Sequence, residues 1–187
     1  MPFYNVEHSF PLTLEQKSHL ADRITKLHAQ TFTTPSIFVQ VKYYQQDASS
    51  HNHFVGGKSR DETTNRIIAY VRSSAERKKE HFDKLAEQIE NAWYIALGER
   101  AEEGDEGKQK KETPQREKDA KELLSIGFVG GLVGREKGFL LPEAGKEEQW
   151  IKSYRKDFEK RAELGDEGIK DMLEEIDTRE DLKSWRT

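Results

Sequence analysis

Five residues of this sequence could together perform acid–base chemistry on a small carboxylate: Pro2, His28, Arg72, Arg77 and Glu136. A small residue at position 2 normally allows the initiator methionine to be removed, and Pro2 would then carry a free secondary amine. An α-amine titrates at about 7.7–8.0 in model peptides, and burial or nearby cations lower its pKa. Because a general base works best when its pKa is near the working pH, such an amine could move protons at neutral pH.

The two arginines suit a substrate carboxylate. Arg72 ends the apolar run RIIAYVRSS, and Arg77 follows five residues later. The planar fork of a guanidinium forms paired, charge-assisted hydrogen bonds with a carboxylate, and it can also stabilise the charge that develops on a dienolate. Glu136 could instead hold the amine of Pro2 in its protonated form. Pro2 would then act as a general acid instead of a general base.

Each of these residues also has a purely structural explanation. Proline is tolerated as the first residue of a strand, which would explain Pro2. His28 could be a hydrogen-bonded histidine at a helix end, and Arg72 could be an ion-pair partner. Arg77 could be a solvated residue at a helix start, and Glu136 could pair with a neighbouring cation in GREKG. The residue types alone leave both explanations open.

The elements that must position these side chains follow from hydrophobic periodicity. Residues 2–8 (PFYNVEH), SIFVQVKYYQQ, RIIAYVRSS and LLSIGFVGGL read as four strands. A helix is expected to begin after Thr13, with Gln16 completing a capping box, and to end near residues 31–35. The stretch ERKKEHFDKLAEQIENAWYIALGE predicts a second helix, whose apolar residues form one stripe.

The order strand–helix–strand occurs twice, which predicts an α/β (α+β) fold. Two consecutive β-α-β units would form a four-stranded sheet with two helices on one face, since parallel strands need a crossover helix of about this length. The other face of the sheet then needs a cover, and association with other copies of the chain would supply it.

Two segments lie outside this pattern. In residues 99–122, 16 of the 24 residues are charged, and we expect a solvated, flexible insertion within a domain spanning residues 1–145. Residues 146–187 predict a charged helical C-terminal extension. Because this extension carries apolar edges, it should pack on its own domain or on a neighbouring copy.

Composition excludes several classes of function. The chain has 187 residues and a net charge of −4. Because it contains no cysteine, disulfides and thiol catalysis are excluded. Cations and anions are mixed along the chain, which argues against nucleic-acid binding. No apolar run is long enough for a membrane span and no signal peptide is visible, so a cytoplasmic protein is expected. His51 and His53 read as loop residues, and we expect neither a metal nor another cofactor.

In this order and spacing, the motifs resemble the tautomerase superfamily, whose enzymes use an amino-terminal proline. Within it, they are similar to the branch of cis-3-chloroacrylic acid dehalogenase. The resemblance rests on the PFYNV strand, the helix that carries His28, FVQVKY, FVGG, the two arginines and GFLLPEAG. It runs from Pro2 to about Trp150 and is interrupted by residues 99–122.

The resemblance implies a cofactor-independent, homotrimeric enzyme acting on small enol, keto or unsaturated carboxylates. By position, Pro2 matches the catalytic amine, and His28, Arg72 and Arg77 match the groups that bind the substrate carboxylate. Glu136 matches the acidic residue that positions or activates water. The expected activity is keto–enol tautomerisation with the amine of Pro2 as general base.

Two departures from the family pattern keep alternatives open. The arginines are five residues apart, wider than the usual pair, and LLSIGFVGG has only Ile126 or Phe128 where the dehalogenase has a tyrosine. One alternative is a hydratase, dehalogenase or decarboxylase that uses Pro2 as an acid. Another is a trimeric interaction protein that has kept the fold and lost the chemistry.

Overall fold

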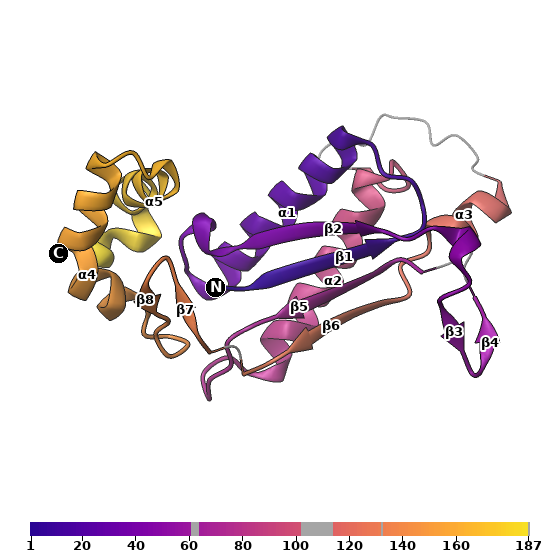
Figure 1. Cartoon of the computed structure of the whole chain (residues 1–187), viewed down its shortest axis with the longest axis horizontal. Coiled ribbons are helices and arrows are strands. Elements are labelled where there is room, and N and C mark those ends of the chain that lie inside the picture. The colour runs from indigo at the N-terminus through magenta and orange to yellow at the C-terminus, as the bar shows by residue number, and fades with distance from the viewer. Residues whose placement is uncertain (61–63, 102–113, 132, 187) are drawn as a thin grey trace.

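The computed structural model describes residues 1–60, 64–101, 114–131 and 133–186 (Figure 1). Its main sheet and the helices that cover it come from two successive β-α-β units. The first unit consists of β1 (Phe3–His8), α1 (Leu14–Phe32) and β2 (Gln40–Gln45), and the second consists of β5 (Arg66–Tyr70), α2 (Lys79–Ala96) and β6 (Ser125–Val129).

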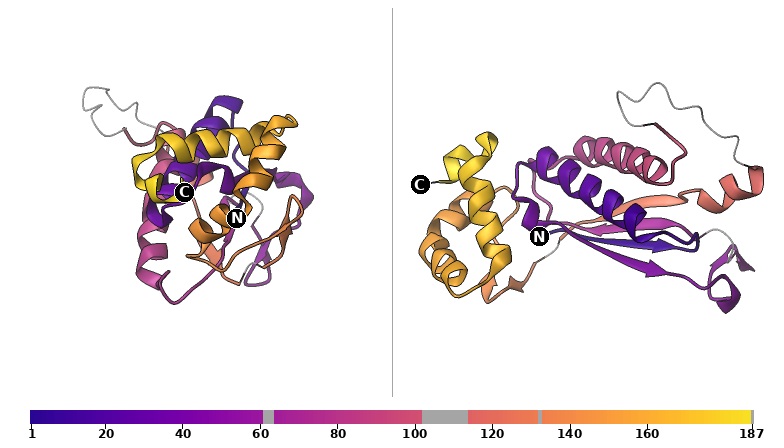
Figure 2. Two further views of the ribbon diagram at one scale, coloured as in Figure 1. Left: turned by 90° about the vertical axis from the view of Figure 1, so that its left-hand side faces the viewer. Right: turned by 90° about the horizontal axis from the view of Figure 1, so that it is seen from above.

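The four strands lie in the order β2-β1-β5-β6. Each β-α-β unit contributes a parallel pair, and the two units meet at an antiparallel pair between β1 and β5. Helices α1 and α2 lie side by side on one face of this sheet (Figure 2). The predicted fold is therefore confirmed.

Helix α1 begins where its capping box places it. Thr13 Oγ1 accepts a hydrogen bond from the Gln16 amide at 3.2 Å, and Gln16 Oε1 accepts one from the Thr13 amide at 2.9 Å. Such a cap satisfies amides that would otherwise lack an intrahelical partner. The stripe Leu20, Ile24 and His28 is buried against the sheet. His28 is thereby fixed on the inner face of the helix.

The main core lies between the sheet and these two helices. It is formed by apolar side chains, of which the largest are Tyr4, Leu20, Ile24, Ile67, Leu85, Ile89 and Trp93. Full burial of an aliphatic or aromatic side chain of this kind stabilises the fold by roughly 1.5–3 kcal/mol. The indole of Trp93 donates a hydrogen bond to the carbonyl of Lys121 at 2.9 Å, so its polar atom is satisfied within the core.

In the described part of the chain, no helix lies on the opposite face of the sheet (Figure 2). The strand register places Phe3 beside Tyr70, Tyr70 beside Val129, and Tyr44 beside Glu7, so these side chains share this face. Phe3, Tyr44, Tyr70 and Val129 are all exposed. We call this face, marked by these four exposed side chains, the open face of the sheet.

The connections between these elements contain two 3-10 turns and a short β-hairpin. Residues 36–46 were expected to form one strand, but Ser36–Phe38 form a 3-10 turn (η1) after Pro35, and the strand begins only at Gln40. A second 3-10 turn, η2, spans Ala48–Ser50, and β3 (Phe54–Val55) pairs with β4 (Lys58–Ser59).

The charged segment of residues 99–122 lies partly outside the described residues, which resume at position 114. Its last part forms a short helix, α3 (Gln115–Lys121), which the sequence pattern did not predict. Lys121 is buried and pairs with Glu99 at 2.6 Å and with Glu117 at 2.7 Å. The carbonyls of Ala120 and Lys121 accept hydrogen bonds from the side chains of Asn65 and Trp93, so the end of this segment is held against the domain, whereas the sequence favoured solvation throughout.

After β6 the chain forms a second layer at the end of the sheet where β1 begins (Figure 1). It comprises the hairpin β7 (Arg135–Glu136) and β8 (Phe139–Leu140), helices α4 (Glu147–Glu163) and α5 (Glu167–Thr178), and the 3-10 turn η3 (Glu180–Trp185). Its own core consists of Met1, Phe38, Ile151, Phe158, Ile169, Met172, Leu173, Ile176, Leu182 and Trp185. In the part of the chain that the structure describes, no helix is long and apolar enough to cross a membrane.

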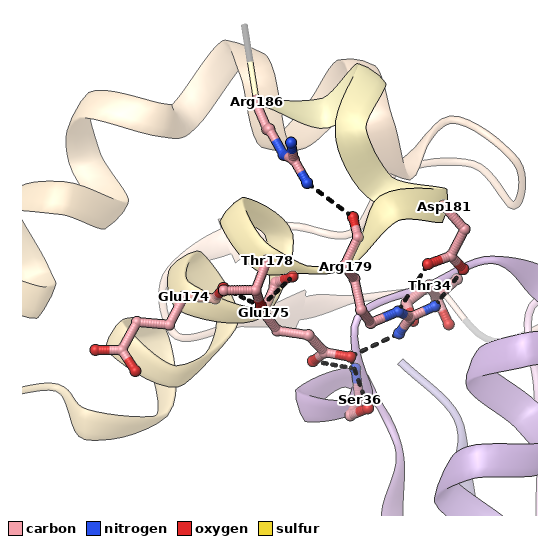
Figure 3. Close-up of polar contacts among 8 residues, drawn as sticks. All are labelled: Thr34, Ser36, Glu174, Glu175, Thr178, Arg179, Asp181 and Arg186. Atoms are coloured by element: carbon pink, nitrogen blue, oxygen red, sulfur yellow. Dashed lines mark hydrogen bonds and ion pairs between the residues drawn. The ribbon is translucent and has the colours of Figure 1, made fainter.

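Polar contacts fix α5 to the chain that follows α1 (Figure 3). The carboxylate of Glu175 accepts hydrogen bonds from the amide and the hydroxyl of Ser36, both at 2.8 Å. Arg179 donates to Glu175 at 2.6 Å and to the carbonyl of Thr34 at 3.0 Å, and its other side is held by Asp181. The helical extension is therefore docked on the first β-α-β unit at this end of the sheet.

Candidate active site

The amino terminus lies at the junction of three strands. Pro2 precedes β1 and is buried, and its carbonyl accepts a hydrogen bond from the amide of Gln40, the first residue of β2, at 3.0 Å. On the other side, Phe3 pairs with Tyr70 near the end of β5, two residues before Arg72. The antiparallel pairing of β1 with β5 thus brings the first and seventy-second residues of the chain close together.

His28 approaches the same point from the helix layer. Its Nδ1 is hydrogen-bonded to the hydroxyl of Tyr4 at 2.7 Å. Burial, followed by the charge of Arg77, lowers the pKa of His28 from 6.5 to about 3, so the imidazole is neutral at physiological pH. Burial also raises the pKa of Tyr4, whose hydroxyl therefore keeps its proton.

Four of the five candidate residues, Pro2, His28, Arg72 and Arg77, line one small cavity together with apolar neighbours. The Arg77 guanidinium also stacks on the ring of Phe32, 4.9 Å from its centroid. The cavity has a volume of about 10 Å³, which is close to the space of a single water molecule. The structure therefore brings four of the candidate residues together, around a cavity too small for a ligand larger than water while Met1 is present.

Glu136, the fifth candidate, lies on β7 at the edge of this group. Its Oε1 accepts a hydrogen bond from Gln40 Nε2 at 3.0 Å. Partial burial raises the pKa of Glu136, while the charges of the chain's amino terminus, Lys137 and Arg72 oppose that shift. Its carboxylate is therefore close enough to the amino terminus for the two charges to interact.

The electrostatic environment of the amino terminus favours an uncharged amine. The pKa of the Met1 amine falls from 8.0 to about 5, first because of burial and then because of the charge of Arg72. Arg77 adds to this shift, and the carboxylates of Glu136 and Glu147 oppose it. A secondary amine exposed at Pro2 by removal of Met1 would lie one residue further along the same buried segment.

Glu147 is a residue of this site that sequence reasoning missed. Its Oε1 accepts hydrogen bonds from Arg72 Nη2 at 2.7 Å and from Arg77 Nη2 at 2.5 Å. The side chain is 3% exposed, against 6% for Arg72 and 10% for Arg77. Because Glu147 begins helix α4, the sequence pattern gives it the ordinary role of an acidic residue in a first helical turn. Its pairing with Arg72 and Arg77 becomes visible only when α4 is docked at the end of the sheet.

The arginine pair keeps hydrogen-bonding capacity beyond Glu147. Arg72 Nη1 donates to the carbonyl of Pro142 at 2.7 Å, and its Nη2 donates to Glu147. Each guanidinium has five N–H donors, and both use the same carboxylate oxygen here. Two positive charges therefore share one buried carboxylate, which leaves an excess of positive charge for a second anion.

Among the described residues, no group of three or more histidine, aspartate or glutamate side chains is arranged to hold a metal ion. The residues brought together here offer an imidazole, two guanidiniums and the carboxylates of Glu136 and Glu147 beside the amino terminus. These groups can bind a carboxylate and transfer protons.

Solved structures of known proteins share the fold. A member of the cis-3-chloroacrylic acid dehalogenase family matches with a TM-score of 0.56 and 22% identity, over 81% of this chain and 91% of its own. A native fused 4-OT matches with a TM-score of 0.51 and 13% identity, over 74% of this chain and 94% of its own. Another fused 4-OT, described as a wild-type asymmetric trimer, matches with a TM-score of 0.50 and 13% identity over the same shares of the two chains. The fold is thus that of the tautomerase superfamily.

The chain belongs to the Tautomerase_3 family, described as "Putative oxalocrotonate tautomerase enzyme", whose match covers residues 1–155. The resemblance to the tautomerase superfamily that the sequence motifs indicated is confirmed. None of the proteins with curated functions matches this chain.

Proposed function

We propose that this protein is a cofactor-independent tautomerase that uses Pro2, after removal of Met1, as a general base on small enol, keto or unsaturated carboxylates. One observation carries the proposal: the amino terminus is buried beside Arg72 and Arg77, where the pKa of the Met1 amine falls to about 5. A base that is uncharged at neutral pH and lies next to an anion-binding pair is what proton transfer on a carboxylate requires.

In the proposed reaction, the nitrogen of Pro2 removes the proton of an enol hydroxyl. The electron pair of that O–H bond forms the carbonyl, and the electrons of the C=C bond take up a proton at carbon. The ammonium of Pro2 supplies that proton, so the amine is regenerated and no cofactor is consumed. The reverse sequence, from ketone to enol, uses the same groups.

Arg72 and Arg77 would bind the substrate carboxylate with the donors that Glu147 does not use. Glu147 itself would act as a positioning residue, because it holds the two guanidiniums together at 2.7 and 2.5 Å from one oxygen. His28 is neutral and hydrogen-bonded to Tyr4, so it would add an uncharged contact to the same carboxylate. Partial neutralisation by Glu147 would favour a substrate with one carboxylate at this position.

Acid catalysis is the alternative reading of the same residues. Glu136 and Glu147 both raise the pKa of the amino terminus, which would favour a protonated Pro2 and hence a hydratase, dehalogenase or decarboxylase. Burial and the two arginines outweigh them, because the net shift is downward. This balance favours the base, and the pH dependence of the rate separates the two: a base loses activity as the pH falls, and an acid loses it as the pH rises.

We also propose that the chain forms a homotrimer through the sheet face opposite helices α1 and α2. Phe3, Tyr44, Tyr70 and Val129 expose apolar surface on this face. Helices α1 and α2 cover the other face, and burying this one would remove the apolar surface of these four side chains from water.

The test compares two amino termini of the same chain. Mass spectrometry identifies protein that begins at Pro2 and protein that retains Met1, and each is assayed with phenylenolpyruvate. We expect turnover only from the form that begins at Pro2, because an amide nitrogen at Pro2 has no basic lone pair. Pro2→Ala should lower kcat/KM by about 100-fold or more, within the range of general-base catalysis.

Pro11→Ala is the matched control, since Pro11 is exposed and lies outside the site. Its rate should equal that of the unchanged protein. Equal turnover by the Met1 and Pro2 forms would refute the proposal. Absence of turnover in both forms, with intact folding, would favour the interaction protein over the enzyme.

A further inference from the structure

A large cavity lies directly beside the amino terminus, between the first β-α-β unit and the helical extension. Its volume is about 480 Å³, within the range of roughly 300–1,000 Å³ that is usual for small-molecule sites. It is lined from one side by η1 and the start of β2, and from the other by β7, β8, α4 and α5. Met1 is one of its lining residues, and Phe38 lines both this cavity and the small cavity at Pro2.

The lining is mainly apolar. Phe38, Phe139, Trp150 and Phe158 form a connected aromatic wall, in which Phe139 and Phe158 lie 4.8 Å apart and Trp150 and Phe158 lie 5.2 Å apart between ring centroids. Ile37, also a lining residue, contributes from η1. Surface of this kind recognises an apolar group by its size and shape.

Several polar residues at the cavity already have partners within the protein. Glu175 accepts hydrogen bonds from Ser36 and Arg179 (Figure 3), and Lys137 pairs with Asp166 at 2.5 Å. Glu136 accepts a hydrogen bond from Gln40 and interacts electrostatically with the amino terminus. These polar residues are thus engaged within the protein, and of the remaining lining residues all but Asp171 are apolar.

Met1 shows how a ligand could occupy both parts of the site. Its amine lies close enough to Arg72, Arg77, Glu136 and Glu147 for their charges to shift its pKa, and its side chain belongs to the apolar cluster of the helical extension. It thus joins a polar head at the arginines to an apolar tail at the cavity. Removal of Met1 would vacate this path and open the cavity toward the nitrogen of Pro2.

We propose that this cavity is a substrate subsite for an aryl group or for an alkyl chain of about six or more carbons, carried by a 2-oxo or enol carboxylate. The carboxylate takes the place of the Met1 backbone beside Arg72 and Arg77, and the apolar group follows the Met1 side chain into the cavity. The inference rests on the proposed function, because it assigns the reacting group of the ligand to the position of Pro2.

The test is a binding series with the protein that begins at Pro2. Isothermal titration calorimetry measures the Kd of straight-chain 2-oxo acids with four to ten carbons. Burial of each added methylene should lower Kd by about three- to fourfold until the cavity is full. In the same preparation, the ketonisation of phenylenolpyruvate is measured separately.

Two substitutions of Ile37 change the cavity in opposite directions. Ile37→Phe should shorten the chain length at which affinity stops increasing, and Ile37→Ala should lengthen it. Leu164→Phe is the control, because Leu164 is exposed and lies outside the cavity, and it should leave the series unchanged.

The possible results separate the two proposals. A Kd that does not depend on chain length, or a series that Ile37 does not affect, overturns the subsite even if turnover still depends on Pro2. A chain-length dependence that shifts with Ile37 supports the subsite. If that dependence occurs without turnover that requires Pro2, the subsite stands and the proposed catalysis is refuted.

Discussion

Glu147→Gln tests the ion-pair arrangement on which the site is built. The substitution keeps the shape of the side chain and removes the negative charge between Arg72 and Arg77. All three side chains are at most 10% exposed, so water can compensate little of the lost charge. Removing one partner of a buried ion pair costs about 3–5 kcal/mol. Because the glutamine oxygen can still accept a hydrogen bond, we expect a loss near the lower end, about 3 kcal/mol of unfolding free energy.

Urea unfolding and thermal melting measure this loss. For a chain of this size, 1 kcal/mol corresponds to about 2–4 °C, so the Tm should fall by about 6–12 °C. Asp83→Asn is the matched control, because Asp83 pairs with Lys79 on the surface, where the two side chains are 55% and 81% exposed. An exposed pair contributes at most about 1 kcal/mol, and this control should lower the Tm by less than about 4 °C.

Glu147→Gln should weaken the folded state but strengthen the binding of a carboxylate substrate. Without the carboxylate of Glu147, the two guanidiniums keep their full charge for the substrate, and the KM of a carboxylate substrate should fall even though the protein is less stable. A Glu147→Gln protein that is no less stable than the Asp83→Asn control would refute the buried pairing. A stability loss accompanied by a higher KM would show that the positioning by Glu147 matters more than its competition with substrate.

Two further predictions concern pH and assembly. Since the pKa of His28 is lowered from 6.5 to about 3, the unfolded chain binds a proton that the folded chain does not, and unfolding free energy should decrease as the pH falls below 6.5, by up to about 1.4 kcal/mol per pH unit. His28→Gln should flatten this pH dependence of the unfolding free energy, measured by urea titration at pH 7 and pH 5. The control His51→Gln, at an exposed position, should not. If the pH dependence is the same in both variants, it does not come from His28. Native mass spectrometry should detect a trimer that Tyr70→Asp dissociates, and a monomer in the unchanged protein would refute the proposed use of the open face.

Much of the fold could be predicted because its signals are local. The capping box of Thr13 and Gln16, the helical stripe that ends on His28, and the alternation of the strands depend on residues a few positions apart. The repeated strand–helix–strand order then restricts the topology, because a crossover helix must join parallel strands. That Pro2 and Arg72 approach each other follows from the antiparallel meeting of the two units, so much of the candidate site could also be inferred.

Other features depend on contacts between distant segments. No pattern around Glu147 reveals that its carboxylate lies between Arg72 and Arg77, since the ion pairs join residues at least 70 positions apart. The helix α3 in a strongly charged segment was missed for a related reason: Lys121 is held by Glu99 and Glu117, and charge alone predicts solvation.

The sequence by itself determined the two β-α-β units, the side on which His28 lies and the set of residues that could do chemistry. Only the tertiary structure decided what surrounds them: the helical extension docks at the amino terminus, Glu147 neutralises part of the arginine pair, and an apolar cavity opens beside Met1. The physical reason is the range of the interactions. Periodicity and caps act within one element, whereas a cavity or a buried ion pair exists only once independently formed elements have packed together.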